Sequence, residues 1–134
     1  LHTQLDNNVA ILKLFPGITK EFVQHTLNTP NLKALIIETY GSGNAPTAHW
    51  FIDGLKESIE KGLIIYNVTQ CKSGSVEMGR YETSLDLNRI GVLSGHDITT
   101  ESAIAKLMYL LGEGYPAEKV KELLQIPIRG EITL

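Results

Sequence analysis

The feature that most constrains the fold of this chain is the alternation of short apolar runs with segments of helical period. Four runs are rich in Val, Ile and Leu and end at glycine, proline or polar residues: 9–17, 33–41, 63–69 and 91–95. Continuous apolar runs of this length predict strands that are buried on both faces. The intervening segments place apolar residues three and four positions apart, which predicts amphipathic helices. Strands and helices that alternate in this way predict a parallel sheet covered on both faces.

Five segments are predicted to be helical. In one of them, Phe51, Leu55 and Ile59 form a single apolar stripe, and Gly62 supplies the conformation that commonly ends a helix. The predicted helices cover residues 18–30, 46–62, 84–91, 97–114 and 115–125. The fold class is therefore α/β: a small four-stranded parallel sheet with helices on both faces, Rossmann-like but smaller than a full dinucleotide-binding domain.

The C-terminal part of the chain gives more specific expectations. Thr99 or Thr100 is expected to cap the helix that follows, because a threonine hydroxyl accepts hydrogen bonds from the free N–H groups of the first turn. The apolar face of this helix is predicted to consist of Ile104, Leu107, Met108 and Leu111. The turn at residues 129–131 is expected to be solvated, because it holds a glycine between two charged residues.

Composition narrows the class of protein. The 134 residues suit one compact domain, and a net charge of −3 without a basic run argues against nucleic acid and membrane as partners. No apolar run approaches the ~20 residues that a membrane-spanning helix needs. The single cysteine, Cys71, excludes a disulfide within the chain and fits a reducing compartment. The chain begins with leucine, so we expect it to be part of a longer protein.

Two loops lie where an open α/β sheet binds ligands, at the carboxyl ends of its strands. The first, "GSGNAP" at 41–46, matches two glycines of the dinucleotide motif and fails at the third, where Pro46 stands. A tight turn that contains Asn44 explains the same residues. The second loop, residues 70–83, holds Glu77 and Tyr81. Both are candidates only because of their position, as is Tyr40 at the end of its strand.

The residues alone do not complete a catalytic site. Cys71 has no histidine at a recognisable protease spacing to activate it, and the four histidines are too scattered for a local zinc motif. The sequence therefore indicates a ligand-binding edge, with no full set of nucleophile, base and oxyanion donors.

Several motifs together carry a family resemblance. They are "YGSGNAP" (40–46), "NVTQCKSGSVEMGRYET" (67–83), "TTESAIAKLMYLL" (99–111) and "IRGEITL" (128–134). From residue 9 onward the chain resembles the C-terminal domain of bacterial type I, or cytoplasmic, L-asparaginases.

The resemblance implies a two-domain amidohydrolase that cleaves L-asparagine to L-aspartate and ammonia, without a metal or an organic cofactor. Its nucleophilic threonines belong to a larger N-terminal domain, so residues 1–134 are expected to form a single C-terminal domain that is inactive alone. Residues 1–8 are then a remnant of the interdomain linker. The resemblance also implies a cytoplasmic homodimer or homotetramer that associates through this domain.

The resemblance further implies two sets of binding residues and no catalytic residue in this chain. Asn44, Tyr81 and Glu77 are expected to contact the substrate across the subunit interface. Thr69, Cys71 and Glu38 match positions of an effector site for asparagine. The relatives have an arginine at the position of Glu38, which suits the carboxylate of the effector, whereas a glutamate repels it. We therefore expect that the effector site does not persist in the same form.

Two other functions remain compatible with the sequence. One is a non-catalytic module that binds asparagine or a similar amino acid. The other is the asparaginase-like subunit of an archaeal amidotransferase, which supplies ammonia for tRNA amidation.

Overall fold

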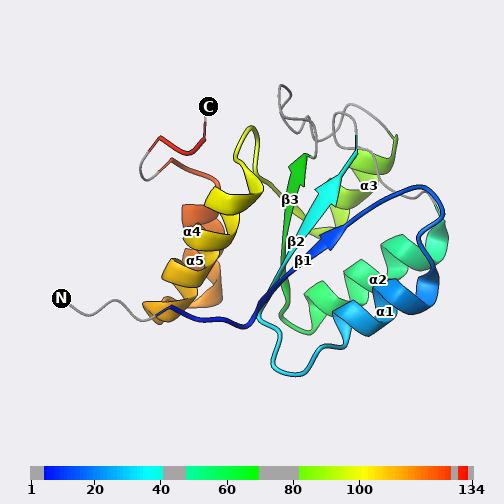
Figure 1. Ribbon diagram of the computed structural model, residues 1–134, viewed down its shortest axis with the longest axis horizontal. Coiled ribbons are helices and arrows are strands. Elements are labelled where there is room, and N and C mark those ends of the chain that lie inside the picture. The colour runs from blue at the N-terminus through cyan, green and yellow to red at the C-terminus, as the bar shows by residue number, and fades with distance from the viewer. Residues whose placement is uncertain (1–4, 41–47, 70–81, 128–129, 133–134) are drawn as a thin grey trace.

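A single parallel sheet forms the centre of the molecule (Figure 1). The computed structural model describes residues 5–40, 48–69, 82–127 and 130–132, so Asn44, Cys71, Glu77 and Tyr81 lie outside the described residues. All strand pairs are parallel, and the strand order is β1-β2-β3-β4. The strands are β1 (Val9–Lys13), β2 (Ala34–Thr39), β3 (Ile64–Thr69) and β4 (Leu93–Ser94).

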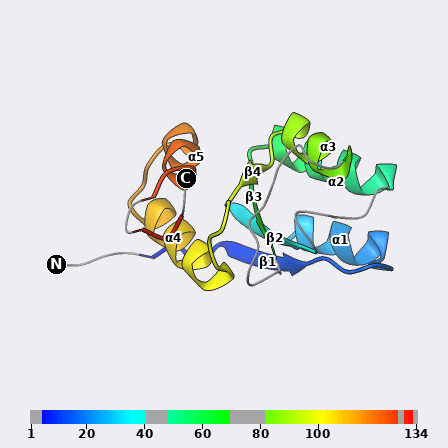
Figure 2. The same ribbon diagram turned by 90° about the horizontal axis from the view of Figure 1, so that it is seen from above.

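Helices cover both faces of the sheet, as the view from above shows most clearly (Figure 2). One layer contains α1 (Lys20–Leu27), α2 (His49–Glu60) and α3 (Glu82–Ile90). The other layer contains α4 (Thr100–Gly112) and α5 (Ala117–Leu124). The predicted α/β class, with its order of strands and helices, is confirmed.

The core has two halves, one on each side of the sheet. Alternation along β2 sends Leu35 and Ile37 toward α1 and α2, and Ala34 and Ile36 toward α4 and α5. All four of these side chains are fully buried. The predicted burial on both faces is therefore confirmed for the central strand β2.

The same prediction was wrong for the first strand. β1 lies at the edge of the described sheet, and its Ile11 is 42% exposed. In α1, Val23 is buried whereas Phe22 is 53% exposed. An apolar residue in the right period therefore does not by itself identify the buried face.

The predicted apolar face of α4 was partly wrong. Thr99 caps the helix, as expected, and its Oγ1 accepts from the Ser102 N–H at 3.1 Å. The buried residues, however, are Ala103, Lys106, Leu107 and Leu110. Leu107 is buried as predicted, and Ile104 and Leu111 pack partly buried against the same core, but the fully buried face also includes a lysine.

The buried lysine, Lys106, holds the C-terminal segment against α4. Lys106 Nζ donates to the Ile126 carbonyl oxygen at 2.6 Å and lies 2.5 Å from Glu131 Oε2. The Lys106 and Glu131 side chains are only 5% and 12% exposed, and Ile132 belongs to the core on the α4–α5 side. The prediction of a solvated turn at 129–131 was therefore wrong for Glu131.

Other boundaries differ slightly from the predictions. α3 begins at Glu82, inside the segment 70–83 that was expected to be loop, and β4 is shorter than the predicted strand at 91–95. α2 ends as expected, because Gly62 follows it with a φ of 106° and Glu57 pairs with Lys61 at 3.2 Å.

Candidate functional site

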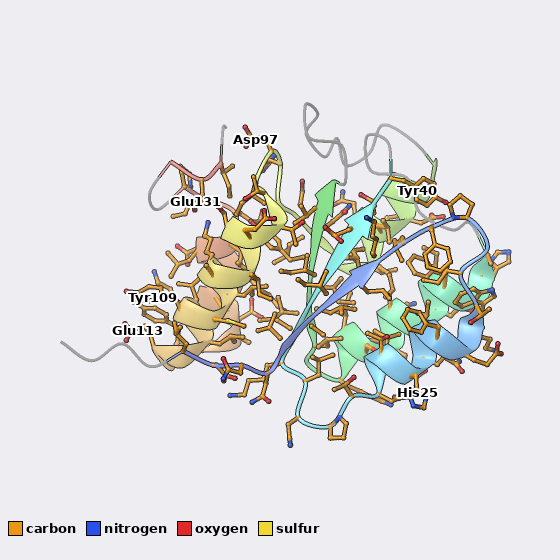
Figure 3. The ribbon with its side chains drawn as sticks, in the orientation of Figure 1. His25, Tyr40, Asp97, Tyr109, Glu113 and Glu131 are labelled. Carbon is orange, nitrogen blue, oxygen red and sulfur yellow. The ribbon has the colours of Figure 1, made fainter. Side chains whose placement is uncertain are left out.

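The candidate site lies at the carboxyl ends of β2 and β3. Thr39 and Thr69, the last residues of these strands, are direct register partners. The segments that contain Asn44 and Cys71 therefore leave the sheet from neighbouring positions. Tyr40 lies at this edge, at the top of the view in Figure 3. Its partly buried ring packs against the core on the α1–α3 side.

Two fully buried polar side chains join β2 to β3 at this edge. Thr39 Oγ1 donates to Asn67 Oδ1 at 2.8 Å and lies 3.4 Å from the Val68 carbonyl oxygen. Both Thr39 and Asn67 are 0% exposed. Every buried side-chain polar atom in the described part of the chain has a hydrogen-bond partner, so this polar contact is satisfied despite its burial.

The residue that follows β4 is hydrogen-bonded to Asn67. The Gly95 N–H donates to the Asn67 carbonyl oxygen at 2.8 Å. A Cβ at Gly95 would lie 2.7 Å from Ile98 Cγ2 and 3.0 Å from that carbonyl oxygen, so only glycine fits. The chain then turns at His96, whose φ is 55° and whose N–H donates to Ser94 Oγ at 3.2 Å.

Glu38 occupies the other side of the edge, against α4. Thr100 Oγ1, at the start of α4, donates to Glu38 Oε2 at 2.6 Å. A carboxylate is favourable there because the N-terminus of a helix carries a partial positive charge. A hydroxyl bonded to a carboxylate is also one part of a nucleophilic arrangement. In this domain the hydrogen bond between Thr100 and Glu38 joins β2 to α4.

Buried charges and hydroxyls beyond the edge belong to the packing of α4 and α5. The Tyr66 hydroxyl is buried and donates to the Leu124 carbonyl oxygen at 2.7 Å. Burial, with a smaller contribution from Glu131, raises the pKa of Tyr66 well above its usual range, so this hydroxyl stays protonated.

Near the N-terminus, the hydrogen bond from Lys33 lowers the pKa of Asp6.

Another feature of the described residues lies at the opposite end of the sheet. A groove of about 540 Å³ opens beside the amino ends of β2 and β3, between the ends of α2 and α4. Its lining includes Lys33, Lys61, Ile64 and Tyr115.

The described residues contain no group of three or more side chains that could hold a metal ion. None of the helices in the described part of the chain is long and apolar enough to cross a bilayer.

Helical layers on both faces of a short parallel sheet define an open α/β domain. Residues 8–124 match the family model of the Glutaminase/Asparaginase C-terminal domain. The chain therefore belongs to this family, which confirms the resemblance found in the sequence.

Named relatives agree with this family. The chain is 37% identical over 133 residues to L-asparaginase 1 of Escherichia coli strain K12, a match that covers 99% of this chain and 39% of the relative. The crystal structure of L-asparaginase I from Vibrio cholerae superposes with a TM-score of 0.90 at 41% identity. That match covers 98% of this chain and 39% of the Vibrio chain. The chain thus spans well under half the length of these relatives.

The same domain is similar to parts of proteins with other names. The chain is 40% identical over 134 residues to the 60 kDa lysophospholipase of Homo sapiens, covering 99% of this chain and 23% of that protein. It is 36% identical over 132 residues to a glutamyl-tRNA(Gln) amidotransferase subunit of Methanococcus maripaludis strain C7. That match covers 98% of this chain and 31% of the archaeal protein.

The structure places only part of the predicted binding set. Glu38 and Thr69 lie at the ends of β2 and β3, whereas the other predicted residues lie outside the described ranges. Sequence reasoning missed Asn67, although a signal for it was present. It is the one amide in the otherwise apolar strand run "LIIYNV".

Proposed function

We propose that this chain is the C-terminal domain of an L-asparaginase, an amidohydrolase that converts L-asparagine to L-aspartate and ammonia. The observation that carries the proposal is the 37% identity to L-asparaginase 1, which extends over 99% of this chain. The match of residues 8–124 to the Glutaminase/Asparaginase C-terminal domain supports it.

The proposal assigns binding to this domain and bond cleavage to another part of the enzyme. Asn44, Tyr81 and Glu77 provide polar contacts to the amide substrate across a subunit interface. The nucleophilic threonines come from the N-terminal domain of the enzyme. The hydroxyls of Thr39 and Thr100 are engaged in contacts between elements of this domain, which supports this division. Hydrolysis of an amide through a threonine ester needs no organic cofactor.

The assembly and location follow from the same proposal. The domain associates with a second copy, and the enzyme works as a homodimer or a homotetramer in the cytoplasm. Substrate contacts from a partner subunit need such an assembly. Light scattering on the full-length gene product measures its mass directly. A monomer with full activity would contradict this part of the proposal.

The test of the activity compares two proteins. The full-length gene product is expected to release ammonia from L-asparagine, measured in a coupled NADH assay. The 134-residue chain alone is expected to release none, because it lacks the nucleophile. Ammonia release by the short chain at the rate of the full-length protein would overturn the division of labour. Absence of release by the full-length protein would overturn the activity itself.

Glu38 leads us to propose that the enzyme has no asparagine effector at this edge. The Glu38 carboxylate accepts a hydrogen bond from Thr100 within the domain, and its negative charge opposes the binding of a second carboxylate. The rate is therefore expected to rise hyperbolically with asparagine concentration in steady-state assays. A sigmoidal curve would show that an effector binds despite Glu38.

A second candidate function is favoured by one specific observation, the 36% identity to the archaeal amidotransferase subunit. A protein of that kind supplies ammonia to a partner that amidates tRNA. Ammonia release that rises severalfold with the partner protein and aminoacylated tRNA would favour this function. A module that only binds an amino acid would instead show saturable binding in calorimetry and no ammonia release.

A further inference from the structure

We infer that α5 and the C-terminal segment form a strap that opens as one unit from the rest of the domain, and that the buried side chain of Lys106 is its latch. The strap is defined as α5, residues 125–127 and residues 130–132. The inference is independent of the proposed function, because the contacts that carry it join described residues of α4, β3 and the strap.

Three polar contacts hold the strap against α4 and β3. Lys106 Nζ on α4 donates to the Ile126 carbonyl oxygen at 2.6 Å and lies 2.5 Å from Glu131 Oε2. The Tyr66 hydroxyl on β3 donates to the carbonyl oxygen of Leu124, the last residue of α5, at 2.7 Å. The last carbonyl oxygens of a helix have no partner within the helix, so this donor comes from outside α5. All three contacts are lost if the strap lifts.

The charge of Lys106 makes the strap a two-state element. The Lys106 side chain is only 5% exposed while the strap is closed, and a buried ammonium without an opposite charge is strongly unfavourable. A partly lifted strap that removes Glu131 but leaves Lys106 buried is therefore disfavoured. In the open state, water hydrates both charges instead. The strap is thus expected to be either closed or open, with few intermediate positions.

Apolar packing holds the strap at only a few points. α5 buries Val120 and Leu124. Of the described residues after α5, only Ile132 is buried, whereas Ile126 is 43% exposed. The desolvation of a buried ion pair offsets much of the attraction between its charges. The closed state is therefore expected to be only modestly favoured, which permits reversible local opening.

α4, in contrast, has attachments that the strap does not share. Thr100, at the start of α4, donates to Glu38 of β2 at 2.6 Å. Further along α4, the Met108 carbonyl oxygen accepts the Asp6 N–H at 3.0 Å. The helices α1, α2 and α3 lie on the other side of the sheet (Figure 2). Opening of the strap can therefore leave the sheet, α4 and the opposite helical layer folded.

Native-state hydrogen exchange on the full-length gene product tests the inference. The amides of α5 and of Glu131 and Ile132 are expected to exchange through one common opening, with a lower free energy than the amides of β2 and β3. A series at low denaturant concentrations measures this free energy for each amide. If the α5 amides exchange only together with those of β2 and β3, through global unfolding, the inference is overturned.

Glu131→Gln tests the latch. It removes the carboxylate that pairs with Lys106 in the closed state, so exchange in α5 is expected to accelerate about 10- to 100-fold. The control is Glu57→Gln, which breaks an exposed pair with Lys61 and is expected to leave exchange in α5 within about twofold. Unchanged exchange in Glu131→Gln would contradict the role of Lys106.

A second control separates the strap from the stability of the whole domain. Val23→Ala leaves a cavity under α1, in the half of the core on the other side of the sheet. Exchange in β2 and β3 is expected to accelerate about 10-fold, whereas α5 stays within about twofold because the strap opens without disturbing Val23. Equal acceleration in α5 and β2 would show that α5 opens only with the whole domain, and the inference would fail.

A double variant keeps the test decisive if Glu131→Gln folds poorly. Lys106→Met combined with Glu131→Leu replaces the ion pair by apolar side chains, which need no opposite charge. Exchange in α5 is expected to be no faster than in the wild type, because an apolar replacement of a buried ion pair is often neutral or stabilising. Exchange at least about 10-fold faster than in the wild type would refute the claim that the buried charge limits the stability of the closed strap.

Discussion

At the scale of single residues, the proposal depends most on Asn44. Its amide can donate to and accept from a substrate amide, and a buried polar group that loses its partner costs ~1–3 kcal/mol. Asn44→Ala in the full-length protein is therefore expected to lower kcat/KM for asparagine by about 10- to 100-fold. Asn28→Ala, on the exposed end of α1, is the control and is expected to leave kcat/KM unchanged. An unchanged value for Asn44→Ala would remove this residue from the site.

Thr100 tests whether the chain contains a nucleophile of its own. Its hydroxyl bonds to the Glu38 carboxylate at 2.6 Å, which is the geometry of a hydroxyl beside a proton acceptor. We interpret this contact as structural, because it holds the start of α4 against β2. Thr100→Val is therefore expected to keep kcat within about twofold, with Thr100→Ser as the control. Loss of activity in Thr100→Val but not in Thr100→Ser would identify Thr100 as the nucleophile.

At the scale of elements, the C-terminal segment depends on one ion pair with α4. Glu131→Gln removes the carboxylate that pairs with the Lys106 ammonium and leaves the hydrogen bond to the Ile126 carbonyl oxygen, and both side chains are largely buried. Chemical denaturation is expected to show a loss of about 2–4 kcal/mol. The control is Glu57→Gln, which breaks the exposed pair with Lys61 and is expected to cost less than about 0.5 kcal/mol. Equal losses would show that burial does not matter here.

The sequence predicted elements better than it predicted their orientation. Period and caps were sufficient for the element order and for the Thr99 cap, because both depend on local chemistry. The face of α4 was missed because Lys106 looks like a solvent-facing residue until Glu131, 25 positions later, is brought beside it. For the same reason, the exposure of Ile11 depends on β1 being at the edge, which no local pattern reveals.

The candidate site was predictable to the same limited degree. The two candidate loops were expected at the carboxyl ends of the second and third strands. The register of Thr39 with Thr69 shows in addition that these two ends are neighbours in the sheet. The hydrogen bonds around Asn67 were not predicted, because Thr39 and Gly95 are each 28 positions away from it in the sequence. Asn44, Glu77 and Tyr81 remain predictions that come from the family resemblance.

At the scale of the whole molecule, the sheet ends at an open edge. Among the described strands, β1 pairs only with β2, and its Ile11 is 42% exposed. An unpaired strand with an exposed apolar side chain favours pairing with another chain. Ile11→Lys is therefore expected to reduce the self-association of the 134-residue chain, measured by light scattering across a concentration series. Lys13→Ile is the opposite change at the same edge and is expected to increase it. No difference among the three proteins would show that association uses another surface.

The two ends of the sheet also differ in their suitability for chemical labelling. Lys61 closes α2 beside the 540 Å³ groove, with its side chain 73% exposed. The groove opens at the amino ends of strands that are about 20 Å long, whereas Thr39 and Asn67 lie near their carboxyl ends. A label coupled at Lys61 therefore lies at the end of the sheet opposite to Thr39 and Asn67.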